Sequence, residues 1–272
     1  MPKKIFTIVV YIFAFIGFVL VGGYVAVRFG VTNTSGIVDS QREAFLANAV
    51  SSQNPTWAST PEWQTLEAAI RRDAPTIQKA ADDSGVPARL IAANLVAEQL
   101  RLFFTEREFY KQFFFPLKIL GSQTQFSWGV MGMKEDTAIA VENNLKDSTS
   151  AFYPGARYAN LLDFASSTSM IDNQKEERFT RMTDQLDHYW SYLYAGLYMK
   201  EVETEWANAG FPIADNPAVV STLYNIGFAN SHPNANPQVG GAAITLGNET
   251  YSFGGLALDF YNSNLLLDIF PR

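Results

Sequence analysis

The stretch "NLVAEQLRLFF", residues 94–104, contains one carboxylate, Glu98, among apolar neighbours. A lone acid in a helix of this kind either lies on a solvated stripe or has a chemical task. Asn94 lies four positions before Glu98 and Arg101 three positions after it, so a helix places all three on one polar face. That face can look toward water or line a cleft, and the helix alone does not decide between them.

Composition limits the kinds of function to consider. The chain has 272 residues, 47% of them hydrophobic, which suffices for one sizeable globular domain or two small ones. The net charge of −7 and the lack of a Lys/Arg cluster argue against nucleic acid as a partner. Without cysteine, disulfides, thiol catalysis and Cys-ligated zinc are excluded. His188 and His232 are too few for most histidine metal sites, and we expect His188 to be an ordinary helix residue.

The N-terminus carries the clearest physical signal. "IFTIVVYIFAFIGFVLVGGYVAV", residues 5–27, has no charge, and as a helix at about 1.5 Å per residue it would cross a hydrocarbon core of ~30 Å. Lys3 and Lys4 precede it, which predicts that the short N-terminus lies in the cytoplasm and the rest outside. A cleavable signal peptide cut after Gly23 is the competing interpretation, but its apolar core is usually shorter. We favour an uncleaved single-pass anchor in the cell membrane.

The rest of the chain predicts a mainly α domain behind a linker. The sequence predicts a cytoplasmic N-terminus (1–4), a transmembrane anchor (5–27), a linker with one short helix near 40–49 (28–60) and a helical domain (61–272). Pro61 marks a helix start and Gly85 its stop, with Pro75 expected to divide that helix. Further helices are predicted from residue 87, over 133–145, over 176–210 as one helix or two, from Asn216 and Pro217 onward, and over 255–270.

An aromatic run follows the helix of Glu98 and has three interpretations. Its members are Phe103, Phe104, Phe109, Tyr110, Phe113, Phe114 and Phe115. Core packing is favoured, because aromatic side chains contribute large buried areas. A lid over a sugar-binding groove and an amphipathic element on the membrane are the alternatives.

Three short stretches, taken in order, resemble the lytic transglycosylases and goose-type lysozymes. They are "GVPARLIAANLVAEQ" (85–99), "SWGVMGMKEDTA" (127–138) and "STLYNIG" (221–227). The resemblance implies a lysozyme-like α-helical fold that cuts the glycan strands of peptidoglycan, with Glu98 on the position of the catalytic glutamate. Gly129, Val130 and Met131 match the family's Gly-Leu-Met segment. Tyr224, Asn225 and Gly227 match its Tyr-Asn-x-Gly helix.

The chain departs from the family pattern in three places. Gln99 stands where the family usually has Ser after the catalytic Glu, and Gly132 replaces a Gln in the second motif. Gly129 follows Glu98 by 129 − 98 = 31 positions, which exceeds the spacing expected for the family, and the aromatic run fills that gap. These differences leave room for an inactive relative.

The chemistry of glycan cleavage explains the interest in a single acid. Protonating a glycosidic oxygen near neutral pH requires a carboxyl that keeps its proton, and apolar surroundings favour this state. We therefore expect Glu98 to be held uncharged. Ordinary glycosidases use two carboxylates, and no convincing second one is found. The resemblance removes that need, because one glutamate would act first as acid and then as base, giving 1,6-anhydro-N-acetylmuramic acid (anhydro-MurNAc).

The resemblance also implies a substrate-binding set around Glu98. Tyr224 would direct its hydroxyl toward Glu98 or the sugar, Asn225 would hold the helix or bind an acetamido group, Gly129 would allow close backbone approach and Met131 would line the sugar subsites. Gln99 and Ser127 complete this set.

The predicted partners are peptidoglycan and, through residues 5–27, the membrane; no metal or cofactor is implied. The rival hypotheses are a catalytically silent glycan-binding or scaffolding relative and a hydrolytic muramidase that uses water.

Overall fold

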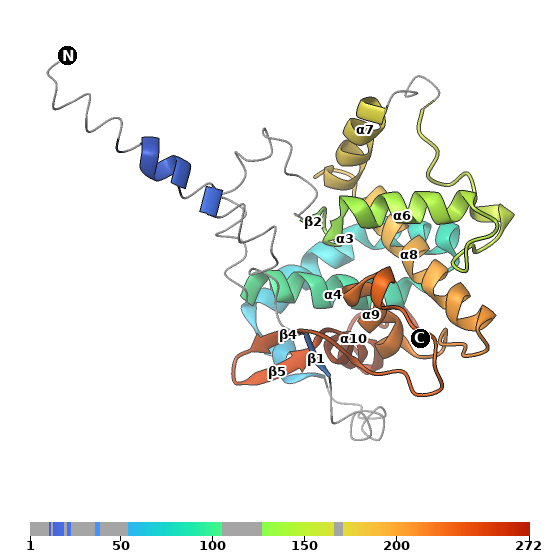
Figure 1. The fold of residues 1–272 in the computed structure, drawn as a ribbon. Helices are drawn as coiled ribbons and strands as arrows, with labels where there is room; N and C mark the ends of the chain where they lie inside the picture. The colour runs from blue at the N-terminus through green and yellow to red at the C-terminus, as the bar shows by residue number, and fades with distance from the viewer. Residues whose placement is uncertain are drawn as a thin grey trace, which may run out of the picture.

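The computed structural model describes residues 11, 13–18, 21–22, 36–38, 54–104, 127–165 and 171–272. Over these residues the fold is mainly helical, as predicted, with a three-stranded and a two-stranded sheet (Figure 1). The predicted short helix near 40–49 and residues 105–126 of the aromatic segment lie outside the described residues.

Helix α3 (Pro61–Ser84) begins and ends where its sequence signals predict. The Thr60 side chain accepts a hydrogen bond from the Trp63 backbone N–H, and Gly85 closes the helix with a φ of 70°. The prediction that Pro75 divides this helix is wrong, because α3 continues through it. An internal proline costs about 3 kcal/mol, but Ile70 and Ile77 are buried on either side of it, so packing against the core outweighs the local penalty.

Helix α4 (Ala88–Phe104), which carries Glu98, is the central element of the domain. It contacts helices on several sides and one strand: α3, α8 (Tyr189–Asn208), α9 (Pro217–Ile226), α10 (Phe253–Asn262) and β4 (Gly240–Leu246). In Figure 1 it crosses the middle of the molecule, with α9 and α10 on one side and α6 (Glu135–Lys146) and α8 on the other. This central position explains why α4 is apolar around most of its circumference.

The start of α4 is tied to the C-terminal tail by a buried arginine. The guanidinium of Arg89 donates five hydrogen bonds to backbone carbonyls of Phe260, Tyr261, Ser263, Leu265 and Phe270. Burial, with a further contribution from Arg272, lowers the pKa of Arg89 to about 10. One side chain thereby organises the residues that follow α10, where the predicted helix over 255–270 ends early, at Asn262.

The span predicted as one helix or two is two helices. These are α7 (Ile171–Thr183) and α8, separated by a turn in which the Asp184 carboxylate accepts hydrogen bonds from the backbone N–H groups of Leu186 and Asp187. Helix α9 has the predicted start, since the Asn216 side chain accepts from the Val219 N–H and Pro217 follows it.

Residues before Pro61 also contribute to the fold. Strand β1 (Gly36–Val38) pairs antiparallel with β4, which pairs with β5 (Glu249–Ser252). The short 3₁₀ helix η1 (Thr56–Ser59) inserts Trp57, which is 3% exposed, against the ring of Trp63 at a centroid distance of 5.2 Å. Part of the segment predicted as a linker therefore belongs to the globular domain.

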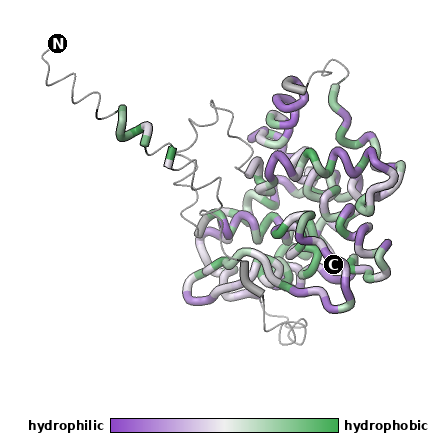
Figure 2. The backbone as a smooth tube through the Cα atoms, viewed as in Figure 1, coloured by the Kyte–Doolittle hydropathy of each residue, from purple (hydrophilic) through white to green (hydrophobic). Residues whose placement is uncertain are grey.

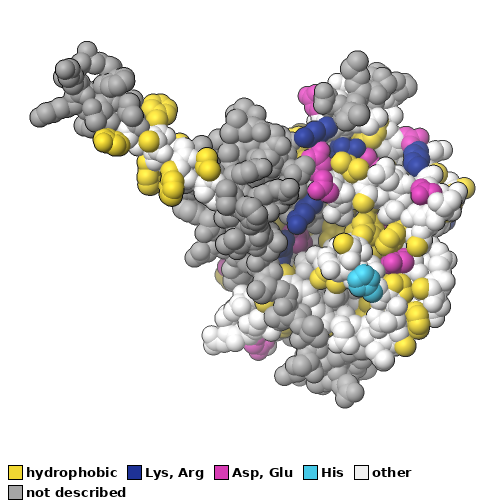
Figure 3. Space-filling model, in the orientation of Figure 1, with side chains coloured by type: hydrophobic (Ala, Val, Ile, Leu, Met, Phe, Trp, Pro, Cys, Tyr) yellow, Lys and Arg dark blue, Asp and Glu magenta, His cyan; other side chains and the backbone are white. Residues whose placement is uncertain are grey.

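The described part of the predicted anchor is helical and apolar. Residues 13–18 appear as hydrophobic in Figure 2, and their large side chains stand out in Figure 3. Phe13 is 70% exposed and Phe18 is 77% exposed. In the portions of the chain that the structure describes, no helix combines the length and apolarity needed to cross a membrane.

Candidate active site

A cavity of about 410 Å³ opens at the C-terminal part of α4. Its wall comes from segments far apart in the chain: α4, the β2–β3 hairpin (Ser127–Trp128 and Met133–Lys134) with the start of α6, α8 through Tyr198, the end of α9 with the residues after it, and the first residues of β4. Each of the three motif-bearing stretches identified in the sequence contributes to this wall.

Glu98 lies in the wall of the cavity and is almost completely buried, with 2% of its surface exposed. The backbone of Gly132 covers its carboxyl group. A Cβ atom at position 132 would lie 1.9 Å from Glu98 Oε1, and the φ of Gly132 is +64°, a conformation that side chains rarely adopt. The departure at Gly132 therefore has a structural reason, because no larger residue fits against this glutamate.

The Glu98 carboxyl is paired with a cation, contrary to the expectation of an acid held uncharged by apolar neighbours. Arg101 Nε donates to Glu98 Oε2 at 3.1 Å, and Arg101 Nη2 makes a second, short contact with Oε1. Both partners are buried, so the pair lies in a low-dielectric part of the site where such interactions are strong. The polar stripe of α4 thus forms an ion pair at the cavity.

The turn between β2 and β3 is held from three directions. The Gln99 side-chain amide donates to the Val130 carbonyl, Ser191 Oγ accepts from the Met131 N–H at 3.3 Å, and the Tyr224 hydroxyl donates to the Met131 carbonyl at 2.7 Å. Helices α4, α8 and α9 therefore all fix the turn that covers Glu98.

Gly129 serves packing in this turn and does not line the cavity. A Cβ atom on Gly129 would lie 2.1 Å from the Met182 carbonyl oxygen at the end of α7, and its φ is +64°. The packing of α7 therefore explains why position 129 needs a glycine. The predicted close approach of a glycan is not needed to explain it.

The predicted substrate-binding residues divide into two groups. Ser127, Tyr224 and Asn225 line the cavity with Glu98. Gln99 and Met131 form the support behind it, as Gly129 does, and Met131 is 0% exposed. A sugar in the cavity would meet Met133 of this hairpin, which lines the cavity, in place of Met131.

Tyr224 is a half-buried tyrosine whose hydroxyl holds a backbone carbonyl. Burial, together with the nearby charge of Glu98, raises its pKa well above the ordinary value, so it remains a hydrogen-bond donor. Its hydroxyl is directed to the Met131 carbonyl, where the sequence predicted Glu98 or a sugar. Its ring packs edge-on against Tyr198 at a centroid distance of 5.3 Å, which fixes α9 against α8.

Asn225 connects α9 to the sheet. Its side-chain oxygen accepts a hydrogen bond from the Ala242 N–H at 2.8 Å, and Gly241 lies against the same oxygen. This agrees with the predicted role in holding the helix. Because Asn225 also lines the cavity, its amide nitrogen is the part that remains for a ligand.

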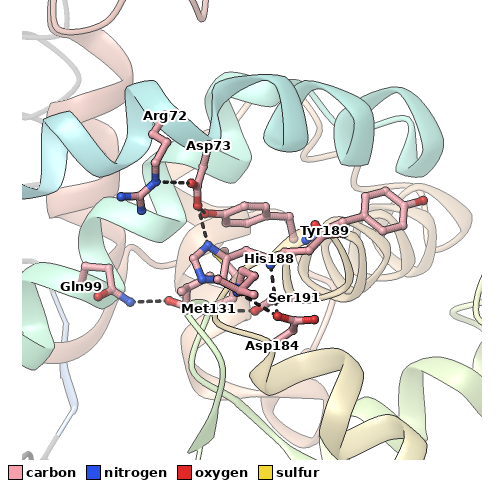
Figure 4. A network of polar contacts seen from close by, with 12 residues as sticks. Arg72, Asp73, Gln99, Met131, Asp184, His188, Tyr189 and Ser191 are labelled. Carbon is pink, nitrogen blue, oxygen red and sulfur yellow. Dashed lines mark hydrogen bonds and ion pairs between the residues drawn. The ribbon is translucent and has the colours of Figure 1, made fainter.

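Behind the turn, a polar network joins the start of α8 to α3 (Figure 4). His188 Nδ1 lies 2.5 Å from Asp73 Oδ2, and the Tyr192 hydroxyl donates to the same oxygen at 2.8 Å. Burial acts to raise the pKa of Asp73, but these hydrogen bonds and the charge of His188 outweigh it and lower the pKa. His188 thus has a structural partner, and Ser191, one turn later, reaches the Met131 turn.

A second buried acid was not singled out from the sequence. Glu201 in α8 is 0% exposed and accepts one hydrogen bond, from Asn144 Nδ2 at 3.0 Å, while its Oε1 has no hydrogen-bond partner among the described residues. Burial raises its pKa well above the ordinary value. The signal was available, because "GLYMKEVET" places this acid in an apolar helix much as residues 94–104 place Glu98.

Glu98 is the single carboxylate in the cavity wall over the part of the chain that the structure describes. Glu135, the residue after cavity-lining Lys134, is buried at the start of α6, with Arg178 and Lys175 each 4.0 Å away. No three His, Asp or Glu residues gather as metal ligands within the described ranges.

Comparison of the chain with protein-family models, with curated proteins and with solved structures finds no match.

Proposed function

We propose that this protein is a membrane-anchored lytic transglycosylase that cleaves the β-1,4 bond between N-acetylmuramic acid and N-acetylglucosamine in peptidoglycan. Residues 5–27 would anchor it, and the helical domain, of lysozyme-like type, would work on the outer side of the cell membrane. Glu98 would be the catalytic residue. The proposal rests on the family resemblance of three motifs and on the arrangement around this glutamate.

The observation that carries the proposal is the meeting of the three motifs at one carboxyl group. Gly132 of the second motif lies against Glu98 of the first, and Tyr224 of the third holds the carbonyl of Met131 next to it. Their sequence separations are large, so chance adjacency of three unrelated motifs at a cavity is a weak explanation. The neutral polar groups of Ser127, Thr137 and Asn225 in the wall suit the hydroxyl and acetamido groups of a glycan.

The proposed reaction needs one carboxyl group in two protonation states. Glu98 first gives a proton to the glycosidic oxygen, and the bond from this oxygen to C1 of the muramic acid breaks. The resulting carboxylate then takes the proton of the C6 hydroxyl of the same sugar, whose oxygen bonds to C1. The product is 1,6-anhydro-MurNAc, and no water is consumed.

The experiment is digestion of purified peptidoglycan by the full chain and by Glu98→Gln, with mass spectrometry of the products. Loss of general acid catalysis should lower the rate by roughly 10²–10⁴-fold. Glu176→Gln, on the exposed surface of α7, is the control and should digest at the wild-type rate. Anhydro-muropeptides from the wild type support a transglycosylase, and reducing-end muramic acid would instead indicate a hydrolytic muramidase. An unchanged rate in Glu98→Gln would refute the assignment.

The Glu98–Arg101 ion pair favours a second candidate, a catalytically silent relative that binds glycan or supports an envelope complex. Both carboxyl oxygens of Glu98 contact the buried Arg101 guanidinium, so this side chain already has a structural partner within the protein. This candidate predicts that the wild type binds peptidoglycan and releases no fragments.

A further inference from the structure

The cavity contains a cation that the proposed chemistry does not use. Three charged side chains line it: Glu98, Arg101 and Lys134. The first two neutralise each other in their ion pair. The Lys134 side chain makes no hydrogen bond or ion pair with any residue that the structure describes, so the described wall carries one uncompensated positive charge in a chain whose net charge is −7.

The backbone of Lys134 is fixed, while its side chain is exposed. The residue pairs with Ser127 across the two-stranded sheet and serves as the N-cap of α6. Met133 before it is buried, and alternation along the strand turns Lys134 outward. Glu135, the nearest acid in sequence, is buried with Arg178 and Lys175 nearby and leaves Lys134 available.

We propose that Lys134 is a specificity residue that binds a carboxylate carried by the glycan in this cavity. The inference rests on the proposed function and extends it from a glycan to an anionic glycan. Apart from the Glu98–Arg101 ion pair, the rest of the polar wall is neutral, with hydroxyls and amides that suit sugar groups. A lysine ammonium adds three donors and a point charge, which a carboxylate matches and a neutral sugar does not.

A carboxylate could come from two parts of the substrate. One is the lactyl group of muramic acid in strands without peptides, and the other is the peptide attached to that group. The chemistry at Lys134 is the same in both cases, so the substrates of the experiment have to separate them.

The experiment compares the full wild-type chain with Lys134→Gln on matched glycans, measuring both binding and cleavage. The glycans are peptide-free strands, peptide-bearing strands, and each of these with its carboxylates converted to amides. Lys146→Gln is the matched control, because it removes the same charge at the far end of α6, where Lys146 pairs with exposed Asp163.

We expect Lys134→Gln to weaken binding of the charged strands, and to lower their kcat/KM through KM, by roughly 3- to 10-fold. Both proteins should bind and cleave amidated strands equally. Raising the salt concentration should reduce the difference between the wild type and Lys134→Gln on charged strands. Lys134→Arg should retain most of the preference. The strand type that shows the loss identifies the source of the carboxylate.

Two outcomes overturn the inference: equal effects of Lys134→Gln on charged and amidated strands, or no effect on either. Failure of the proposed function looks different. A wild type that binds charged strands through Lys134 without cleaving them would refute catalysis and leave the anion site standing, whereas a wild type that binds no glycan refutes both.

Discussion

Two buried glutamates, Glu98 in α4 and Glu201 in α8, have similar sequence surroundings and different structural ones. Glu98 lines the cavity and shares two contacts with Arg101. Glu201 is completely buried outside the cavity wall, accepts one hydrogen bond from Asn144, and forms no ion pair with a described residue. The acid that fits the description of a carboxyl kept neutral by burial is therefore Glu201.

An apolar helical neighbourhood therefore predicts that a glutamate is buried, but not whether a cation pairs with it. What separates the two glutamates is the residue three positions later and the element that each faces. Glu98 has Arg101 there, while Glu201 has Thr204, whose hydroxyl donates to the Lys200 carbonyl of its own helix. A single arginine gives Glu98 an ionic partner, and the cavity gives it access to a ligand.

The largest effect is expected from removing the arginine that distinguishes the two sites. Arg101→Met should lower the free energy of unfolding by about 3–5 kcal/mol, because it leaves a buried carboxylate without its cation. Denaturant unfolding at pH 7 measures this loss.

The double variant Glu98→Gln/Arg101→Met is the matched control for that loss. With both charges removed, most of the stability should return. A double variant as unstable as Arg101→Met would mean that the arginine acts mainly through its other contacts. Arg71→Met, which breaks an exposed pair with Asp268, should cost no more than about 1 kcal/mol.

The sequence predicts the fold best where a boundary is set locally. Thr60 and Gly85 bound α3, and Asn216 caps α9, because each signal is a contact within one helical turn. The same local rules fail at Pro75, where the energy of a buried helix outweighs the defect. They also cannot show that strand β1 reaches β4, two hundred residues away.

The candidate site, like the fold, could be predicted from the sequence only in part. Residues of the three motif-bearing segments, Glu98 and Tyr224 among them, lie at one cavity. The motifs could not show that Met131 turns inward, since this depends on two left-handed glycines and on Ser191, 60 residues later in the chain. The pairing of Arg101 depends on a rotamer, which helical spacing permits without requiring.

A smaller effect on activity and stability, which involves Glu98 and not Glu201, is expected from a side chain added at Gly132, next to the Glu98 carboxyl. Gly132→Ala introduces a Cβ atom 1.9 Å from Oε1 and 2.5 Å from Cδ, so the paired carboxyl must move. We expect peptidoglycan digestion to fall roughly 10²-fold, the effect of misplacing a catalytic group by about 1 Å. The free energy of unfolding should also fall by about 1–3 kcal/mol more than backbone strain alone explains.

Gly247→Ala is the control that separates backbone strain from a steric clash with a side chain. Gly247 has a φ of +63°, almost the same as Gly132, but a Cβ atom there meets nothing within 4 Å. Both alanine variants carry the strain of a left-handed backbone, about 1–2 kcal/mol. Equal stability and activity of the two variants would show that Gly132 is conformational only and that its contact with Glu98 has no consequence.

The smallest effect is expected at Glu201, the acid outside the cavity. It concerns how steeply the free energy of unfolding changes with pH. Burial raises the pKa of Glu201 well above its ordinary value of 4.5. Below that value both the folded and the unfolded chain carry the proton, so the group contributes nothing. Above it the unfolded chain releases the proton while the folded protein holds it, and the stability of the wild type falls as pH rises.

Glu201→Gln removes that titration and keeps the shape of the side chain. Between pH 5 and 7 the variant should gain about 1–2 kcal/mol of unfolding free energy relative to the wild type, with a slope no steeper than about 1.4 kcal/mol per pH unit. Denaturant unfolding of both proteins across this range measures it, and parallel curves would contradict it. Peptidoglycan digestion should persist, because Glu201 does not line the cavity. A folded Glu201→Gln protein without activity would move the catalytic assignment from the ion-paired acid to the neutral one.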